Sequence, residues 1–314
     1  MSPRRSAFID IGTNAILCLI ADLRDTGRFR VLDDLADIAR LGEGVDQFRR
    51  ISPQGEQRAL EVLEHYRDHC RHLGVQEIIA VGTSALRDAE NSAEVLARYR
   101  ERLGFDIRVI SGSEEAAYAF IAVERGLSLG GKDFLVFDIG GGSTEFIRAT
   151  PSGVSLALSI DMGSVRLTER FLHSDPVRAD EVAPMIAAID HELAQLPRRG
   201  IRPEAGLTRV GIAGTFTTLA AVEKRLARYS HGDVHGRCLS LDEVRRQVGL
   251  FREKSVAERR KLPGMDPKRA DVIFAGACLI ERIMNFFHAD SVIVSDQGVR
   301  YGLLYEAAEP RLSC

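Results

Sequence analysis

The chain has 314 residues, of which 45% are hydrophobic and 28% are charged, so a disordered or fibrous protein is excluded and about two domains are expected. The formal net charge of -3 argues against broad nucleic-acid binding, because nucleic-acid-binding domains are usually basic. The first apolar stretch is too short and too polar for a signal peptide or membrane span, and the five cysteines are scattered without a CxxC pair. We therefore expect a cytoplasmic protein that binds neither nucleic acid nor membrane.

The first part of the chain is expected to alternate between strands and helices. Residues 8–21 predict two short apolar strands, separated by a turn at residues 10–14 that is rich in residues tolerating a tight backbone. Ser52 and Pro53 predict the start of a helix, and Gly74 predicts its end. Further along we expect a strand at 78–81, a helix at 92–104, a strand at 107–110 and a helix from about 114 to 126.

The opening strand pair recurs near the middle of the chain. Residues 134–147 repeat the strand, turn and strand, and the tripeptide Asp-Ile-Gly at residues 10–12 returns at residues 138–140. This recurrence predicts a duplicated domain, with an N-terminal copy at residues 1–128 and a C-terminal copy at residues 129–314. In the second copy we expect helices at 180–196, 214–226 and 269–287, strands at 210–213 and 291–294, and a C-terminal helix. The alternation of strands and helices predicts the α/β fold class.

The turns of the two copies share a composition suited to binding phosphate. In the second copy, three consecutive glycines follow an apolar strand, and glycines let backbone N–H groups approach an anion closely. A plain glycine-rich hairpin turn would have the same sequence, but its recurrence favours two phosphate-binding loops that face each other across a cleft. The predicted phosphate-binding residues of the two loops are Gly12, Thr13, Asn14, Gly140, Gly141, Gly142, Ser143 and Thr144.

Three carboxylates lie in or beside these loops, namely Asp10, Asp138 and Glu145. Carboxylate oxygens are the hard ligands that Mg²⁺ prefers, and Mg²⁺ commonly accompanies a bound chain of phosphates. We therefore predict that these three residues bind Mg²⁺, with Mn²⁺ as the alternative ion.

Seven motifs, in the expected order along nearly the whole chain, resemble those of the exopolyphosphatase/guanosine pentaphosphate phosphohydrolase (Ppx/GppA) family. The resemblance implies the actin-like ATPase superfold, with two ribonuclease H-like domains and an active site in the interdomain cleft. The chain lacks the extra C-terminal helical region of longer members, so we expect the short two-domain form. Phe216 stands where a small residue is expected, so the motifs do not decide which substrate the site accepts. The motifs are residues 10–14, 83–91, 111–116, 138–145, 162–169, 214–215 and 298–302.

Glu114 and Glu115 stand at the predicted start of a helix. The helix dipole favours ionised carboxylates there, and Glu114 could form a capping box with Ser111, so a purely structural role would explain both glutamates. The resemblance favours catalysis, because the catalytic glutamate of the family motif aligns with Glu115. We therefore predict that Glu115 is the general base that activates a water molecule, with Glu114 as a second catalytic candidate.

The resemblance also implies further phosphate-binding residues. Arg87, Arg166 and Arg300 match family positions, although a lone arginine is more often a solvated surface group. Gly214 and Thr215 precede a predicted helix, whose N-terminal amides suit a phosphate, and a simple helix cap is the alternative.

The function that these features predict is exopolyphosphatase activity, in which water attacks the terminal phosphate of inorganic polyphosphate. Hydrolysis of guanosine pentaphosphate (pppGpp) at its 5′ γ-phosphate is the alternative substrate for the same chemistry. A kinase of the same superfold is disfavoured because no acceptor pocket can be recognised. A non-catalytic sensor of polyphosphate or of a guanosine alarmone is the alternative from another class, and homodimer formation stays open.

Overall fold

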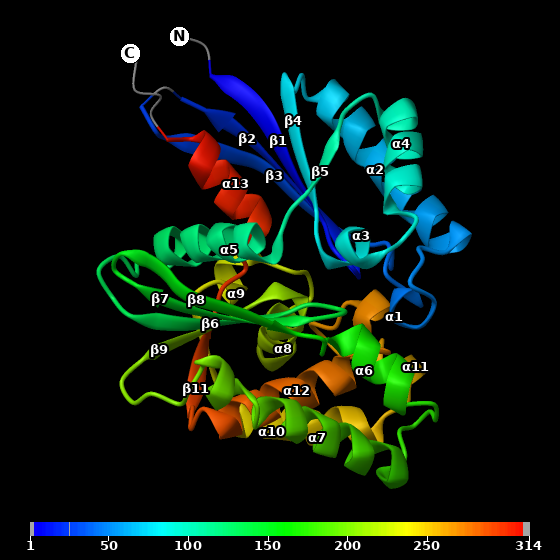
Figure 1. Cartoon of the computed structure of the whole chain (residues 1–314), viewed down its shortest axis with the longest axis vertical. Helices are drawn as coiled ribbons and strands as arrows, with labels where there is room; N and C mark the ends of the chain where they lie inside the picture. The colour runs from blue at the N-terminus through cyan, green and yellow to red at the C-terminus, as the bar shows by residue number, and fades with distance from the viewer. Residues whose placement is uncertain (1–2, 25, 310–314) are drawn as a thin grey trace. The chain divides into compact units, whose positions relative to one another are not determined.

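The computed structural model describes residues 3–24 and 26–309. Contacts between residues divide the chain into two compact units, of which unit 1 comprises residues 1–122 and 298–314 and unit 2 comprises residues 123–297. Figure 1 shows the elements of both units, coloured along the chain. Within the described residues, no helix is both long and apolar enough to cross a membrane.

Unit 1 contains a five-stranded mixed sheet in the order β3-β2-β1-β4-β5. β2 lies antiparallel to both β1 and β3, whereas β4 continues the sheet in parallel with β1 and β5 in parallel with β4. Phe8 and Ile9 on the central strand are fully buried although they point to opposite faces, so both faces of the sheet are covered. The strands are β1 (Arg4–Ile11), β2 (Ala15–Leu23), β3 (Phe29–Ile38), β4 (Glu77–Gly82) and β5 (Ile107–Val109).

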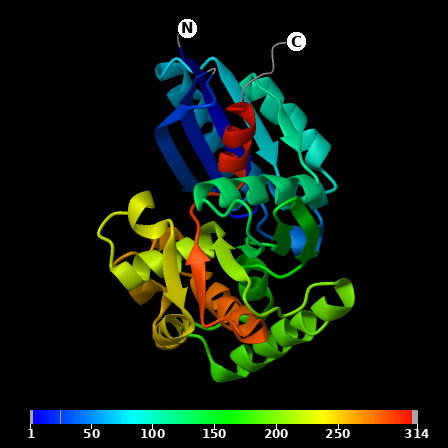
Figure 2. The ribbon, with the colours of Figure 1, turned by 90° about the vertical axis from the view of Figure 1, so that its left-hand side faces the viewer.

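Helices cover the two faces of this sheet. One face packs against α2 and α4 through side chains such as Leu63 and Tyr99, and the other packs against α5 and α13 through Tyr118 and Leu304. Figure 2 shows α13 lying along the strands of unit 1. The helices are α1 (Val45–Phe48), α2 (Pro53–His72), α3 (Ser84–Asp88), α4 (Ser92–Leu103), α5 (Gly112–Gly126) and α13 (Val299–Ala307).

Unit 2 contains a six-stranded sheet in the order β10-β11-β9-β6-β7-β8. A large apolar core lies between the sheet and its helices, and it includes Phe137, Phe146, Leu219 and Phe274. The strands are β6 (Phe134–Ile139), β7 (Thr144–Thr150), β8 (Gly153–Ile160), β9 (Thr208–Ile212), β10 (Arg237–Ser240) and β11 (Ser291–Val294). The helices are α6 (Ser164–Phe171), α7 (Ala179–Leu193), α8 (Ala213–Lys224), α9 (His231–Val234), α10 (Leu241–Glu253), α11 (Val256–Arg259) and α12 (Ile273–Phe286), with short 3-10 helices at Leu196–Arg199 and Pro267–Arg269.

The two sheets repeat one design, as the recurring tripeptide predicts. The order β3-β2-β1-β4-β5 of unit 1 corresponds to the order β8-β7-β6-β9-β11 of unit 2. The first hairpin turn closes in the same way in both units, because the N–H of Gly12 donates to the carbonyl oxygen of Ala15 at 3.0 Å and that of Gly140 donates to Ser143 at 3.0 Å. The duplicated α/β architecture is therefore present in the structure.

The division into units differs from the predicted domain boundary at residues 128 and 129 in two respects. It falls within α5, and it groups α13 with unit 1 rather than with the C-terminal copy. The reason for the second difference is packing, since Leu303 and Leu304 of α13 belong to the same apolar cluster as Phe8 and Leu19 of unit 1. A boundary drawn along the sequence alone has no means of detecting this return of the chain.

Candidate active site

The predicted loop of unit 1 lies at the carboxyl ends of two parallel strands. β1 and β4 pair up to Ile11 and Gly82, so the segments that follow them begin side by side. The hydroxyl oxygens of Thr13 and Ser84 lie 2.7 Å apart, and the N–H of Thr83 donates to the carbonyl oxygen of Ile11 at 3.1 Å. The loop at residues 12–14 is therefore held against the start of α3.

Asn14 has a buried side chain without a partner. Only 6% of this residue is exposed, and neither the amide nitrogen nor the amide oxygen has a hydrogen-bond partner. The backbone carbonyl oxygen of Asn14 accepts hydrogen bonds from the N–H groups of Ala39 and Arg40, at 3.1 Å and 2.9 Å. These bonds fix the backbone of Asn14, whereas its side-chain amide makes no hydrogen bond. Because unsatisfied buried polar groups are rare and costly, this amide points to a polar ligand.

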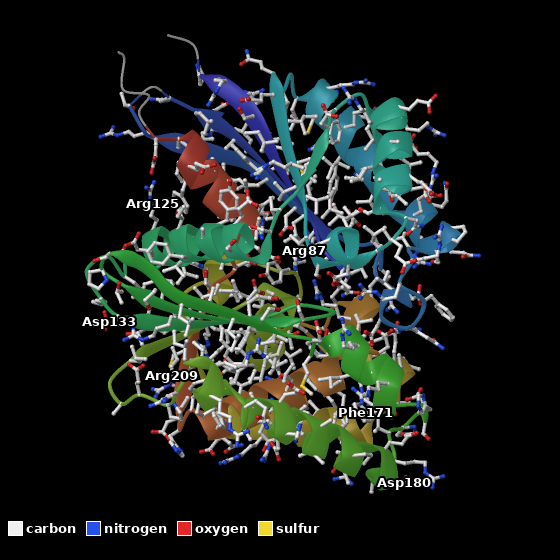
Figure 3. All side chains as sticks on the ribbon, in the orientation of Figure 1. Arg87, Arg125, Asp133, Phe171, Asp180 and Arg209 are labelled. Carbon is white, nitrogen blue, oxygen red and sulfur yellow. The ribbon has the colours of Figure 1, made fainter. Side chains whose placement is uncertain are left out.

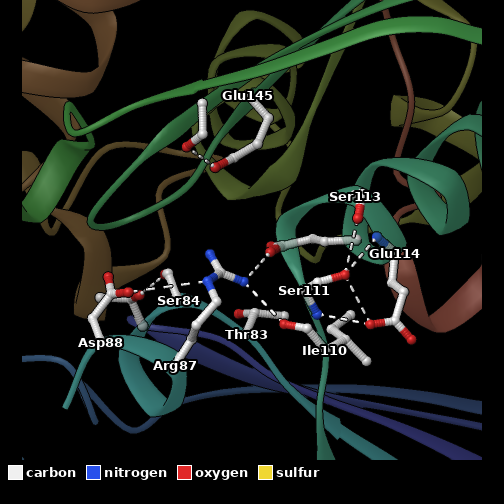
Figure 4. Close-up of polar contacts among 12 residues, drawn as sticks. Thr83, Ser84, Arg87, Asp88, Ile110, Ser111, Ser113, Glu114 and Glu145 are labelled. Carbon is white, nitrogen blue, oxygen red and sulfur yellow. Dashed lines mark hydrogen bonds and ion pairs between the residues drawn. The ribbon is translucent and has the colours of Figure 1, made fainter. Parts of the chain in front are cut away.

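Glu115 and Arg87 form an ion pair near this loop. Nη1 of Arg87 lies 3.1 Å from Oε2 of Glu115 and also donates to the carbonyl oxygen of Ile110 at 3.1 Å (Figure 4). Arg87 projects from α3, where it is labelled in Figure 3. Burial raises the pKa of the Glu115 carboxyl, while the charge and hydrogen bond of Arg87 oppose this rise. Glu115 is thus a held, largely buried carboxylate with a raised proton affinity.

Asp10 lies close enough to Glu115 for their charges to interact. Burial, and to a lesser degree the charge of Glu115, raise the pKa of Asp10 to about 7, and Arg300 opposes the rise. Arg300 itself donates two hydrogen bonds to the carboxylate of Asp34, at 2.8 Å and 3.0 Å, and Tyr301 donates a third at 3.0 Å. The predicted phosphate-binding residue Arg300 is therefore largely buried and bound to Asp34 of β3.

Glu114 has surroundings unlike those of Glu115. Its carboxylate accepts hydrogen bonds from the N–H and hydroxyl of Ser111 at 2.8 Å and 2.9 Å, and the N–H of Glu114 donates back to the Ser111 hydroxyl at 3.2 Å. Arg108 forms an ion pair with the same carboxylate. These contacts lower the pKa of Glu114, and they form the capping box that the sequence offers as an alternative to catalysis.

The glycine loop of unit 2 packs tightly onto the start of α6. The N–H of Ser164 donates to Gly140 at 3.0 Å, and the N–H of Val165 donates to Gly141 at 2.9 Å. A Cβ on Gly163 would lie 2.3 Å from the carbonyl oxygen of Gly141, so only glycine allows this approach. Nε of Arg166 donates to the carbonyl oxygen of Gly142 at 2.7 Å. The carbonyls of the loop are thereby bound on the helix side.

A row of polar residues crosses three strands beside this loop. Asp138 of β6 pairs with Glu145 of β7, and Glu145 pairs with Ser159 of β8, so all three share one face of the sheet. The hydroxyl of Ser159 donates to Oε1 of Glu145 at 2.8 Å, and Glu145 is drawn in Figure 4. Thr144 lies on the opposite face, where its hydroxyl donates to the carbonyl oxygen of Met162 at 2.6 Å.

Gly214 and Thr215 lie at the start of α8, next to the glycine loop, because β9 runs parallel to β6. The preceding residue Ala213 has a φ of 70°, a left-handed conformation that costs energy for a residue with a Cβ and that often marks a functional site. Phe216, which stands where a small residue is expected, is fully buried in the core of unit 2.

Arg269 is a site candidate that sequence reasoning missed. Its guanidinium lies against Gly214, since a Cβ there would come within 2.0 Å of Nη1. Burial lowers the pKa of Arg269, and the carboxylate of Asp266 lies 3.9 Å from its Nε. The only local signal was an arginine at the start of an apolar helical stretch, which does not reveal that the side chain reaches α8.

Each unit brings together part of the predicted site. In unit 1, the loop at residues 12–14 lies against α3, which carries Arg87, and the charges of Asp10, Glu115 and Arg300 interact, whereas Glu114 binds Ser111 and Arg108. In unit 2, Asp138 and the loop at residues 140–143 lie beside Glu145, Arg166, Gly214 and Thr215.

The carboxylates fit Mg²⁺ held partly by substrate. Among the described residues, no group of three or more histidine, cysteine, aspartate or glutamate side chains forms a complete metal site. Mg²⁺ usually binds one or two carboxylates together with water and substrate phosphates rather than a protein cage. Burial is the main cause of the raised pKa of Asp10 and the charge of Glu115 adds to it, so a divalent cation beside Asp10 would favour the ionised carboxylate. The residues of both units therefore suit this ion.

Comparisons with known proteins agree with these features. The model of the Ppx/GppA phosphatase family matches residues 19–310. Exopolyphosphatase 2 of Mycobacterium tuberculosis is 34% identical over 325 residues, which cover 98% of this chain and 100% of the relative. The crystal structure of the Aquifex aeolicus member of the Ppx/GppA family superposes with a TM-score of 0.81 at 31% identity and covers 99% of each chain. The match supports the predicted fold class, two α/β sheets of the actin-like ATPase type.

Other relatives extend beyond the matched region. The bifunctional 3-dehydroquinate synthase/phosphatase of Fusobacterium nucleatum is 32% identical over 311 residues, and the chain spans 46% of its length. A guanosine-5'-triphosphate,3'-diphosphate pyrophosphatase of Vibrio atlanticus is 29% identical over 316 residues, and the match covers 98% of this chain and 60% of the relative.

Proposed function

Because the chain belongs to the Ppx/GppA phosphatase family and is a phosphoanhydride hydrolase, we propose that it is an exopolyphosphatase that releases terminal phosphates from inorganic polyphosphate. The relative that matches it over its whole length is named an exopolyphosphatase, which supports this substrate. The observation that carries the chemistry is the Glu115 carboxylate, which is held by Arg87 and has a side chain that is only 13% exposed.

In the proposed reaction, Glu115 accepts a proton from a water molecule as the water oxygen bonds to the terminal phosphorus. The bond from phosphorus to the bridging oxygen breaks, and the shortened chain leaves with the electron pair on that oxygen. A general base works best when its pKa approaches the working pH, and burial raises the pKa of Glu115 in that direction. Arg87 keeps the carboxylate oriented, and its charge and hydrogen bond oppose the rise in the pKa of Glu115.

General base catalysis supplies roughly 10²–10⁴-fold, whereas enzymes accelerate reactions by about 10⁶–10¹⁷-fold. Most of the acceleration must therefore come from groups that bind the phosphate and its developing charge. We assign this task to the loops at residues 12–14 and 140–143, to Arg166 and to Gly214 with Thr215. Mg²⁺, for which Asp10, Asp138 and Glu145 are the proposed ligands, would neutralise phosphate charge when bound.

Guanosine pentaphosphate is the second candidate substrate, because the Vibrio relative is named a guanosine-5'-triphosphate,3'-diphosphate pyrophosphatase. The same base and the same phosphate loops would serve it. A sensor that binds but does not hydrolyse is disfavoured because Glu115 is present and held in place.

The test is phosphate release from long polyphosphate, short polyphosphate, guanosine pentaphosphate and ATP, each with Mg²⁺. We expect release from polyphosphate and a product shortened by single phosphates. Release from the guanosine compound alone would support guanosine pentaphosphate as the substrate. Binding without release from any of the four would support a sensor instead.

A further inference from the structure

The start of α5 is held by a set of contacts that the proposed reaction does not use. The carboxylate of Glu114 is bound on one side by Ser111 (Figure 4). On the other side it forms an ion pair with Arg108. Arg108 also donates to the hydroxyl of Tyr118 at 3.0 Å, and that hydroxyl donates to the carboxylate of Glu306 at 3.1 Å. One chain of contacts thus joins β5, the first two turns of α5 and α13, all within unit 1.

The same short segment carries Glu115. The backbone N–H of Glu115 donates to the carbonyl oxygen of Ser111 at 3.0 Å, and its side chain binds Arg87, which binds the neighbouring carbonyl of Ile110 at 3.1 Å. Residues 110 and 111 are therefore held from one side by Arg87 and from the other by Glu114. The position of the Glu115 carboxylate therefore depends on the contacts of Arg87 and on those of Glu114.

The helix α13 packs closely against α5 beside these contacts. A Cβ on Gly302 would lie 2.3 Å from the carbonyl oxygen of Tyr118, so α13 and α5 touch along their backbones. The contact chain through Tyr118 and Glu306 runs beside this approach. The first two turns of α5 are thus in contact both with β5, which precedes the helix, and with α13 near the other end of the chain.

The chemistry of the two glutamates separates their roles. The Ser111 and Arg108 contacts lower the pKa of Glu114, which makes its carboxylate a poor proton acceptor, whereas burial raises the pKa of Glu115. Both oxygens of Glu114 are already engaged within the capping box and the ion pair.

We propose that Glu114 and Arg108 are positioning residues, which fix the first turn of α5 so that Glu115 meets the attacking water. This inference rests on the proposed role of Glu115 as the base. Exposed ion pairs add little to stability, but a catalytic group displaced by about 1 Å can lose roughly 100-fold in rate. The pair should therefore affect kcat far more than it affects folding.

The test compares Glu114→Gln with Glu114→Ala in the full chain, with kcat and KM measured on polyphosphate and Mg²⁺. The glutamine amide keeps an oxygen that accepts from Ser111 but loses the ion pair with Arg108, so we expect Glu114→Gln to lower kcat less than Glu114→Ala does. Glu114→Ala should lower kcat by about tenfold or more with KM nearly unchanged. Arg108→Ala, which also leaves the Ser111 contacts in place, should resemble Glu114→Gln, and the double alanine variant should be no worse than Glu114→Ala.

Two results would overturn the inference. If Glu114→Gln lowered kcat far more than Arg108→Ala, the carboxylate of Glu114 would act in the reaction itself rather than through its contact with Arg108. If Glu114→Ala kept normal kcat, the residue would have no positioning role. Amide hydrogen exchange of residues 108–118 gives a readout independent of turnover, and it should be faster in Glu114→Ala than in Glu114→Gln. Full activity of Glu115→Gln would instead contradict the proposed base, while the exchange result would still stand.

Discussion

Nη1 of Arg87 lies 3.1 Å from Oε2 of Glu115 and donates to the carbonyl oxygen of Ile110 at the same distance. A single guanidinium nitrogen therefore connects the proposed base to the loop that precedes its helix. Arg87 is also the group that lowers the pKa of Glu115 against the effect of burial.

Replacing Arg87 with methionine should shift the pH dependence of the reaction. Without Arg87 the pKa of Glu115 rises, and because the base must be ionised to act, activity should be lost at a higher pH as the solution is acidified. The acid limb of the plot of kcat/KM against pH should therefore move to higher pH. Arg102→Met, which removes an exposed guanidinium paired with Glu64, is the control and should leave the profile in place.

Asn14 and Asn91 are both buried in unit 1, but only Asn91 is satisfied. The amide of Asn91 donates to the carbonyl of Ile51 at 3.0 Å and accepts its N–H at 2.9 Å. Asn91→Ala should therefore lower the free energy of unfolding by about 2 kcal/mol and leave KM unchanged. Asn14→Ala should cost little stability but raise KM by about tenfold, because its amide is reserved for a ligand. Chemical denaturation would measure the stability of both variants, and steady-state kinetics would measure their KM. A loss of stability in Asn14→Ala with an unchanged KM would contradict the prediction.

Gly163→Ala should disturb the glycine loop of unit 2. The new methyl group would lie 2.3 Å from Gly141 and 2.6 Å from the nitrogen of Gly142, both backbone atoms, so the loop must move. We expect a loss of about 1–3 kcal/mol in unfolding free energy and a lower kcat/KM. Gly130→Ala, where a Cβ meets nothing within 4 Å, is the matched control. Equal kinetics in the two variants would mean that the loop does not bind phosphate.

Removal of divalent cations should stop phosphate release. Asp10→Asn removes one proposed ligand, so the Mg²⁺ concentration for half-maximal activity should rise by about tenfold or more. Asp106→Asn changes an exposed carboxylate paired with Arg100 and serves as the control. Titration of Mg²⁺ against initial rate distinguishes the two, and activity that persists in a chelator would rule out the metal.

The sequence predicts the elements that depend on local signals. Ser52 accepts the N–H of Gly55 at 3.0 Å and so starts α2, and Gly104, with a φ of 77°, ends α4. The paired strands at the two Asp-Ile-Gly tripeptides are confirmed as β1 with β2 and β6 with β7. The predicted helix at residues 269–287 begins later, at Ile273.

Tertiary contacts explain what the sequence does not predict. The sequence prediction does not include β3 or β8. The edge strand β3 mixes polar and apolar residues without clear alternation, whereas in β8 the residues Val154, Leu156, Leu158 and Ile160 alternate with small or polar ones, a local signal that the prediction missed. Arg300 matches a family motif, yet its partner Asp34 lies 266 positions away. The capping box of Glu114 is local and was offered from the sequence, but its ion pair with Arg108 and the contact of Arg269 with Gly214 required the fold.

The most direct test of catalysis by Glu115 is the comparison of Glu115→Gln with Glu124→Gln, a control on the same helix. Single turnover and steady-state rates would be measured on polyphosphate with Mg²⁺, and substrate affinity would be measured separately. We predict that Glu115→Gln binds polyphosphate normally but loses at least about 100-fold in kcat, whereas Glu124→Gln keeps both. Near-normal turnover of Glu115→Gln would contradict the assignment of this residue as the base.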